Sequence, residues 1–303
     1  TGNSATVTNG VYTTGTQTIS GLKTFTGGLG STGAGANSFR AGTSAGATTQ
    51  GTESVAVGYL AGQTSQGDSA VAIGSAAGTT SQGIASVAVG TSAGNNTQGA
   101  SSVAVGDHAG QTTQGGFSTA ICFAAGQNSQ GNYAVAIGPA AAGVSQGDGG
   151  ISIGNLAGNN TQGASAIALG TNSGGTTQGE HGIAIGSGAG QAAQGLESIS
   201  IGKFAGNTTQ GASSVCIGIF AGQTTQGSQA VAVGRNAGTT TQGAESVAVG
   251  WRAGTAAQGT QSVAIGSGAG RTNQAANGII ISSKGTQVNS TTAGHITIES
   301  TTA

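Results

Sequence analysis

The dipeptide Gln-Gly recurs every sixteen residues along most of the chain, with no insertion or deletion between its copies. Self-similarity at a fixed short period is typical of proteins built from stacked, near-identical structural units. The sequence therefore predicts a solenoid or fibre, which presents columns of equivalent side chains and no single central pocket. The glutamines of this dipeptide are Gln50, Gln66, Gln82, Gln98, Gln114, Gln130, Gln146, Gln162, Gln178, Gln194, Gln210, Gln226, Gln242 and Gln258.

Composition excludes the other repetitive classes of protein. The 303 residues include 62 glycines but only one proline, and the glycine period is not three, which excludes collagen. A polar, glycine-rich chain with 5% charged residues often indicates disorder. The apolar residues nevertheless keep fixed positions in every unit, which a disordered linker has no physical reason to do. We therefore expect an ordered repeat.

The charge pattern excludes two classes of partner. The formal net charge is −1 and the seven Lys and Arg residues are scattered, so there is no basic patch for nucleic acid or an anionic membrane. No apolar run approaches the roughly 20 residues that a membrane-spanning helix needs. We expect neither nucleic-acid binding nor membrane insertion.

One unit of the repeat shows the expected local structure. Residues 54–58, Ser-Val-Ala-Val-Gly, alternate β-branched with small side chains, which is typical of a short strand that ends at a glycine turn. A second extended piece is expected to begin at Ala61-Gly62, and Gln66-Gly67 is expected to close the coil. Two strands and two turns per unit predict an all-β fold, a parallel β-solenoid of about fifteen sixteen-residue coils and roughly 70 Å in length.

The β-branched pair of each strand is expected to be buried inside the coil, stacked in register on the pair of the next coil. The pairs are Val55/Val57, Val71/Ile73, Val87/Val89, Val103/Val105, Val135/Ile137, Ile151/Ile153, Ile167/Leu169, Ile183/Ile185, Ile199/Ile201, Val215/Ile217, Val231/Val233, Val247/Val249 and Val263/Ile265. Departures from the repeat predict three segments: an N-terminal lead-in or adaptor at 1–34, the repeats at 35–282 and a C-terminal cap at 283–303.

The strand motif resembles the head repeat of trimeric autotransporter adhesins of the YadA type. The resemblance is carried by Ser-Val-Ala-Val-Gly at 54–58, Ala-Val-Ala-Ile-Gly at 70–74 and Ser-Val-Ala-Ile-Gly at 262–266, and it covers residues 37–282. That family builds a left-handed parallel β-roll from three chains side by side, at the tip of an extracellular stalk. The adhesin repeat is usually a little shorter than the present unit.

The longer unit and the flanking segments look more like fibre proteins of tailed phages and large algal DNA viruses. Residues 9–19 with Lys23-Thr24-Phe25 resemble the lead-in of such fibres, and residues 277–282 and 288–294 resemble the segment that follows their repeats. Many of these proteins then carry a trimerising, self-cleaving chaperone domain, which we do not expect within these 303 residues. The resemblance implies a homotrimeric fibre on a virion surface or in another extracellular setting.

The middle position of the strand gives weaker, independent support for a trimer. A strand with Val on one face and Ala on the other has no polar face, so we expect the Ala face to be covered by a neighbouring chain and Cys216 to lie near such a contact. A monomer that exposes this face remains open. The middle residues are Ala56, Ala72, Ala88, Ala104, Ala136, Ser152, Ala168, Ala184, Ser200, Cys216, Ala232, Ala248 and Ala264.

No catalytic, metal or cofactor site is predicted. His108, His181 and His295 occupy unrelated contexts and are expected to be solvated surface residues. Calcium-binding repeats need an Asp in every turn, which this chain lacks. Cys122 and Cys216 differ in register and lie about six coils apart, so no disulfide is expected. Four glycosylation sequons, which begin at Asn95, Asn159, Asn207 and Asn289, match a pattern that is common by chance in such a composition.

The two positions after the turn glycine vary most between units and accept Trp, Pro and Arg, so we expect them to face outward on a ridge of turns. Aromatic residues and Arg dominate binding hot spots, and they gather here in four consecutive coils. We name this set the contact ridge; packing against a neighbouring chain is the alternative interpretation. The contact ridge consists of Lys203, Phe204, Phe220, Arg235, Trp251 and Arg252.

These observations predict a non-enzymatic fibre segment, a spacer and attachment module that binds a host-surface receptor or glycan. One alternative is a subunit of a self-assembling extracellular filament. Another is an ice-binding solenoid, suggested by the Thr-Thr pairs at 48–49, 112–113, 176–177, 208–209, 224–225 and 240–241. Adjacent Thr side chains in a strand are expected to point to opposite faces, and Val144, Ala192-Ala193 and Ala256-Ala257 interrupt the series, which argues against a flat ice-binding plane.

Overall fold

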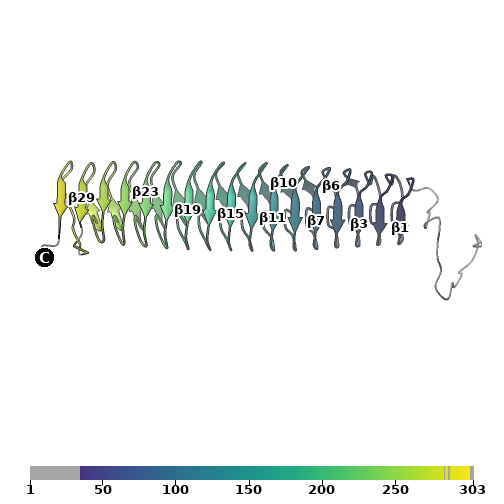
Figure 1. Ribbon diagram of the computed structural model, residues 1–303, viewed down its shortest axis with the longest axis horizontal. Coiled ribbons are helices and arrows are strands. Elements are labelled where there is room, and N and C mark those ends of the chain that lie inside the picture. The colour runs from purple at the N-terminus through teal and green to yellow at the C-terminus, as the bar shows by residue number, and fades with distance from the viewer. Residues whose placement is uncertain (1–34, 283, 286, 301–303) are drawn as a thin grey trace, which may run out of the picture. The chain divides into compact units, whose positions relative to one another are not determined.

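The computed structural model describes residues 35–282, 284–285 and 287–300, so the lead-in predicted at 1–34 lies outside the described residues. The described residues all belong to the second of the two units of the chain, Ser31–Ala303. Its described residues contain no helix, and its strands are parallel and stack as a solenoid of about sixteen turns (Figure 1). The predicted all-β parallel solenoid is confirmed.

The first sheet takes one short strand from each coil. Strands pair in parallel with the strand sixteen residues away, as in Val55↔Val71 and Ala56↔Ala72, except for the last pair, which is offset by seventeen residues; the successive strands lie one after another along the stack in Figure 1. The 17 strands of this sheet are β1 (Phe39–Ala41), β2 (Val55–Val57), β3 (Val71–Ile73), β5 (Val87–Val89), β7 (Val103–Val105), β9 (Thr119–Ile121), β11 (Val135–Ile137), β13 (Ile151–Ile153), β15 (Ile167–Leu169), β17 (Ile183–Ile185), β19 (Ile199–Ile201), β21 (Val215–Ile217), β23 (Val231–Val233), β25 (Val247–Val249), β27 (Val263–Ile265), β29 (Ile279–Ser282) and β30 (Ile296–Glu299).

The second sheet is built from the residues just before the repeated glycine. Its strands include the glutamine of the dipeptide, whereas Ala61-Gly62, where the sequence predicted the start of the second strand, lies in a turn. The 13 strands of this sheet are β4 (Ser81–Gln82), β6 (Thr97–Gln98), β8 (Thr113–Gln114), β10 (Ser129–Gln130), β12 (Ser145–Gln146), β14 (Thr161–Gln162), β16 (Thr177–Gln178), β18 (Ala193–Gln194), β20 (Thr209–Gln210), β22 (Thr225–Gln226), β24 (Thr241–Gln242), β26 (Ala256–Gln258) and β28 (Thr272–Gln274).

The face of the first sheet that is buried is the opposite of the predicted one. The middle residue of each strand from β2 to β29, such as Ala56 or Ala72, is fully buried inside the coil. The flanking Val and Ile side chains point outward; Val55 and Val57 are half-buried and Ile73 is 40% exposed. The prediction that the β-branched pairs fill the coil interior is therefore wrong. The buried position of each strand instead holds Ala, Ser or Cys from β2 to β27, because the glutamine of the coil fills the space beside it; Ile280 in β29 is the large residue of this column.

The interior consists of alanines and glutamines. Ala56 and Ala61 have no exposed surface, and Gln66 is 3% exposed. The Nε2 amide of Gln66 donates a hydrogen bond to the carbonyl of Val55 at 2.7 Å and another to the carbonyl of Ala70 at 3.1 Å. The glutamine therefore crosses the coil and ties the second sheet to the first, and its length lets the buried Nε2 group reach two carbonyl acceptors.

The glycine after each glutamine is required by the stacking distance. A Cβ built on Gly179 would lie 2.6 Å from the backbone carbon of Gly195 in the next coil, a distance that no real contact allows. Ala275 replaces this glycine only in the last unit of the Gln series, where the regular succession of coils ends. The Gln-Gly repeat thus combines a buried cross-link with a close approach of two backbones.

Two turns connect the sheets in each coil. The entry turn precedes the strand of the first sheet and the exit turn follows it; in the coil of β2 these are residues 51–54 and 58–62. Ser54 donates its hydroxyl to the carbonyl of Gly51 at 2.7 Å, which stabilises the entry turn. Glu53 in the entry turn and Leu60 in the exit turn both have a positive φ, near +57°. Their amides bond to the preceding coil, and these hydrogen bonds help to offset the cost of the left-handed conformation.

The C-terminal end departs from the repeat but continues the first sheet. Strand β30 pairs in parallel with β29, so that Ile296 and Ile298 extend the outward Val and Ile columns. Lys284 forms an ion pair with Glu299 at 3.0 Å. Ile298 is 73% exposed, because β30 is the last strand of the sheet.

Candidate contact surfaces

The contact ridge lies on the exit turns, as predicted. Its members occupy the two positions that follow the turn glycine. The first of these positions is the more exposed, and 47% of the surface of Trp251, which occupies it, is exposed. The second position has a positive φ in Phe204, Phe220 and Arg252, close to +56° in each. These side chains are therefore fixed to a regular backbone and project from its edge.

One half of the contact ridge is an aromatic stack with a cation above it. The rings of Phe204 and Phe220, in consecutive coils, are stacked with centroids 5.7 Å apart and planes at 11°. The ammonium nitrogen of Lys203 lies 5.4 Å from the centre of the Phe204 ring, within the range of a cation–π interaction. These three residues form one contiguous group.

The other half is a single Trp–Arg pair. The guanidinium carbon of Arg252 lies 4.7 Å from the centre of the Trp251 ring, so one face of the indole is covered by its own neighbour. Arg235 lies exposed in the coil between the two groups. The structure thus brings the six predicted residues onto one ridge, as two side-chain groups separated by the coil of Arg235.

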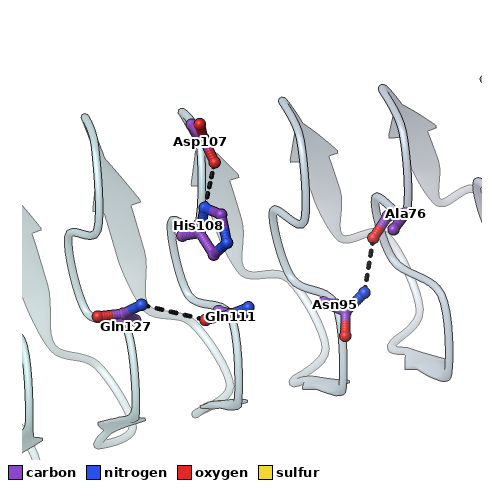
Figure 2. A network of polar contacts seen from close by, with 6 residues as sticks. All are labelled: Ala76, Asn95, Asp107, His108, Gln111 and Gln127. Atoms are coloured by element: carbon purple, nitrogen blue, oxygen red, sulfur yellow. Dashed lines mark hydrogen bonds and ion pairs between the residues drawn. The ribbon is translucent and has the colours of Figure 1, made fainter.

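The exit turns also carry a polar network between coils (Figure 2). The Nδ1 atom of His108 contacts the carboxylate of Asp107, and its ring lies edge-on to Phe123 with centroids 6.5 Å apart. Further round the coils, Gln127 donates to Gln111 Oε1 at 3.1 Å, and Asn95 donates to the Ala76 carbonyl at 2.9 Å. The contacts of Gln127, Asn95 and Phe123 join neighbouring coils, whereas Asp107 and His108 belong to one coil; none of them brings a further titratable group to His108. His181 and His295 are exposed, as expected.

The hydrogen bonds of the sequon asparagines bear on glycosylation. Asn95, Asn159 and Asn207 each donate their side-chain amide to a carbonyl of the preceding coil, at 2.8 to 2.9 Å. The amide of Asn289 donates to Thr272 Oγ1 at 2.8 Å. The nitrogen that would carry the glycan is therefore engaged in the folded protein at all four sites.

Sequence reasoning missed an aromatic pair on the entry turns. Phe117 and Tyr133, sixteen residues apart, are stacked with centroids 5.3 Å apart and planes at 4°, and they are 59% and 66% exposed. Both have a positive φ, as Glu53 has at the equivalent position. The signal in the sequence was the pair of motifs Gly-Gly-Phe and Gly-Asn-Tyr at the same place in consecutive units.

The argument against an ice-binding face was wrong in one respect. Thr208 and Thr209 are both exposed, and so are Thr224 and Thr225, because only the glutamine of each second-sheet strand turns inward. Adjacent threonines therefore share the surface. The interruptions at Val144, Ala192-Ala193 and Ala256-Ala257 remain.

Cys216 was expected near a contact with other chains because it belongs to the small-residue column, but that column lies inside the coil. Cys216 has no exposed surface, and its thiol contacts Gln226 Oε1 inside the coil at 2.7 Å. Burial raises the pKa of Cys216 to about 12, so it stays a neutral thiol at physiological pH. Ser152 and Ser200, at the same position, donate to the glutamine of their own coil in the same way. Cys122 is half-buried, and both cysteines are free, as predicted.

The outward face of the first sheet carries two columns of apolar side chains. Its two columns run from strand to strand in register along the sheet. Four of its members, Ile73, Leu169, Ile217 and Ile265, are 37 to 40% exposed. An exposed apolar surface that runs from coil to coil is a candidate interaction site. We name it the Val/Ile face.

Within the described ranges, no three His, Cys, Asp or Glu side chains come together as metal ligands would. Nor do those residues form any helix long and apolar enough to cross a membrane. No protein-family model matches the chain, and no relative is found among curated proteins.

Proposed function

We propose that the chain is a structural and adhesive fibre segment, a homotrimer of β-solenoids that serves as spacer and attachment module on a virion or other extracellular surface. The observation that carries the proposal is the Val/Ile face, which runs along the coils and has no partner within the described residues. A rigid stack with one apolar face suits side-by-side association of identical chains. The resemblance to adhesin heads and viral fibres supports the same function.

The proposed interface differs from the one that the sequence suggested. The Ala column is inside the coil, so Ala232→Phe or Ala248→Phe would overpack the solenoid itself and would not report on association. The Val/Ile face is the interface instead. Burying an Ile side chain stabilises by about 1.5–3 kcal/mol, and a trimer repeats that gain in three chains at every coil.

The first experiment measures the mass of the assembled species by light scattering. We expect three times the 28.2 kDa chain mass for the wild type, and dissociation with unchanged circular dichroism for Ile217→Asp. Thr225→Asp, on the exposed second sheet, is the matched control and should remain trimeric. A wild-type monomer would reject the proposal, and a mass that grows with concentration would favour the filament.

The second experiment tests the contact ridge as the attachment surface. Trp251→Ser and Phe220→Ser should leave the fold intact, because equivalent positions already hold Ser75 and Ser92. We expect weaker attachment to the cells that the wild-type fibre binds. Unchanged attachment would assign the contact ridge to packing.

Ice binding is retained as a second candidate because of one observation, the exposed Thr pairs of three consecutive coils at 208–209, 224–225 and 240–241. A thermal hysteresis assay separates it from attachment. Measurable hysteresis that is lost in Thr225→Asp would favour ice binding.

A further inference from the structure

The entry turns carry a second surface that the trimeric fibre does not require. Phe117 and Tyr133 together expose two large aromatic rings, and both residues have a left-handed backbone that disfavours side chains. Most coils place a small or polar residue at this position, such as Ser101 before the pair and Ser165 after it. Ser101 and Ser165 have the same left-handed backbone, so the two exposed aromatic rings are what sets this pair apart, and aromatic side chains are enriched at binding hot spots.

The two faces of the Tyr133 ring have different surroundings. One face of the Tyr133 ring stacks on Phe117, and the other face looks toward the next coil, where the equivalent residue is Gly149. With no side chain there, the outer face of Tyr133 is left uncovered. A Cβ built on Gly149 would meet only Ser165 Oγ, at 3.6 Å, so the space above this glycine is open.

The size of this notch follows from the coil spacing. Tyr133 and Ser165 are two coils apart, about 10 Å at the usual spacing of stacked strands. A ring in contact with the tyrosine face lies about 4 Å from it, which leaves room for one ring-sized group and its substituents. Along the stacking direction, the notch is therefore wide enough for one six-membered ring.

Polar groups line the same notch. Oδ1 of Asp148 accepts one hydrogen bond from the backbone N–H of Asn132 at 2.8 Å and another from the side-chain Nδ2 of Asn132 at 3.4 Å. Its Oδ2 atom and the Ser165 hydroxyl have no partner among the described residues, and both residues are exposed. A flat apolar face beside free acceptor and hydroxyl groups is complementary to a sugar, whose ring carbons carry weakly positive hydrogens and whose edge carries hydroxyls.

From this arrangement we propose that the Tyr133 notch binds a pyranose ring of a neutral glycan. The sugar stacks on the outer face of Tyr133, Phe117 supports that ring from behind, and Asp148 and Ser165 hydrogen-bond the sugar hydroxyls. The carboxylates of Asp148 and, two coils further, Glu180 repel anionic sugars, so the site selects uncharged chains. The inference rests on the attachment function proposed above and assigns its ligand class to a different ridge.

The test uses the full chain and saturation-transfer NMR. The probes are the neutral oligosaccharides maltohexaose, cellohexaose and chitohexaose, and the acidic probe is a hyaluronan hexasaccharide. We expect saturable binding of at least one neutral probe and none of the acidic one. Tyr133→Ser removes the stacking face and should weaken binding at least tenfold. Gly149→Phe fills the notch by extending the aromatic stack and should have the same effect.

Ser213→Phe is the matched control, since it adds a ring at the same turn position in a coil far from the notch, and it should bind as the wild type does. The assembled mass of each variant is measured in parallel. Absence of neutral-sugar binding, binding that survives Tyr133→Ser, or a changed mass in either notch variant would overturn the proposal. A wild-type trimer that attaches to cells but binds no neutral probe would refute the ligand assignment alone and leave the fibre function intact.

Discussion

At the scale of single residues, the interior of this solenoid combines apolar alanines with polar glutamines. Gln66 crosses the coil and bonds to both sides, yet its Oε1 atom has no hydrogen-bond donor among the described residues. A Cβ built on Gly62 would lie 2.6 Å from that oxygen, and Gly62 also has φ +53°, so both features favour glycine; Ala142 at the equivalent position shows that a methyl group can be accommodated. Ser200 shows how such an oxygen can be satisfied, because its hydroxyl donates to Gln210 Oε1 at 2.6 Å. The small residue of the strand can thus supply a hydrogen-bond donor for Oε1 of the neighbouring glutamine.

Cys122 supplies a prediction at this scale. It stands at an exit-turn position where the other coils have glycine, with φ +100°. A side chain in this conformation costs about 1–3 kcal/mol, so Cys122→Gly should stabilise the protein by about 1 kcal/mol after the loss of chain entropy is counted. Thermal unfolding followed by circular dichroism measures the change. Cys122→Ser keeps the Cβ and should gain nothing; an equal gain in both variants would refute backbone strain as the cause.

The residue scale is also where sequence reasoning failed most. Alternation of Val and Ala in the strand defines two faces of the sheet, but it does not say which face is buried. Hydrophobicity alone favours burial of Val, whereas the width of the coil allows only the Ala face to be buried. That width is a tertiary property. The repeated glutamines contained the missing information, since a side chain that spans the coil leaves room only for small residues such as Ala56, Ser200 and Cys216 beside it.

At the scale of elements, stacking rather than strand length holds the coils together. The strands of the first sheet are mostly three residues long, as in β2, and isolated strands of that length are not stable. Each one instead pairs with the equivalent strands of its neighbouring coils, and the turns add further bonds, such as Leu60 N to Thr43 O at 3.1 Å. Close backbone approach is the condition for this pairing, and the glycines provide it.

Two glycines make that condition testable. Gly179→Ala places a Cβ 2.6 Å from the backbone of the next coil and should destabilise by about 3 kcal/mol. Gly116→Ala is the control, because its Cβ would meet nothing nearer than the Ala100 carbonyl, at 3.4 Å. Chemical denaturation of both variants gives the comparison. Equal stability would mean that the coils can separate to accommodate a methyl group.

At the scale of the whole solenoid, the fixed period makes every coil equivalent. Because β15 pairs with β17 as β13 pairs with β15, removing one complete unit brings equivalent residues into the same register. The period itself was sufficient to predict this register from the sequence. It could not predict the aromatic pair of Phe117 and Tyr133 as a surface feature, because two isolated substitutions do not disturb a repeat.

Deletion of Gly163–Gln178, a complete unit, should therefore yield a folded protein with a closely similar unfolding temperature and a shorter stack. Deletion of 163–170 alone is the control, since it sets strand residues opposite turn residues and should prevent folding of the coils around it. Circular dichroism and limited proteolysis report both outcomes. Loss of structure in the full-unit deletion would show that coils differ in ways that the repeat conceals.

The strict register also constrains how such a chain comes to be folded and how its length can change. Strand pairings join residues about sixteen positions apart, so no contact in the sheets waits for distant parts of the chain to meet. Once a few coils exist, each further coil finds a finished template, and folding spreads along the polypeptide as it emerges. Genetic recombination between repeats adds or removes whole coils and leaves the strand register of the remaining coils unchanged. The length of the solenoid can therefore evolve independently of the surface residues on its coils.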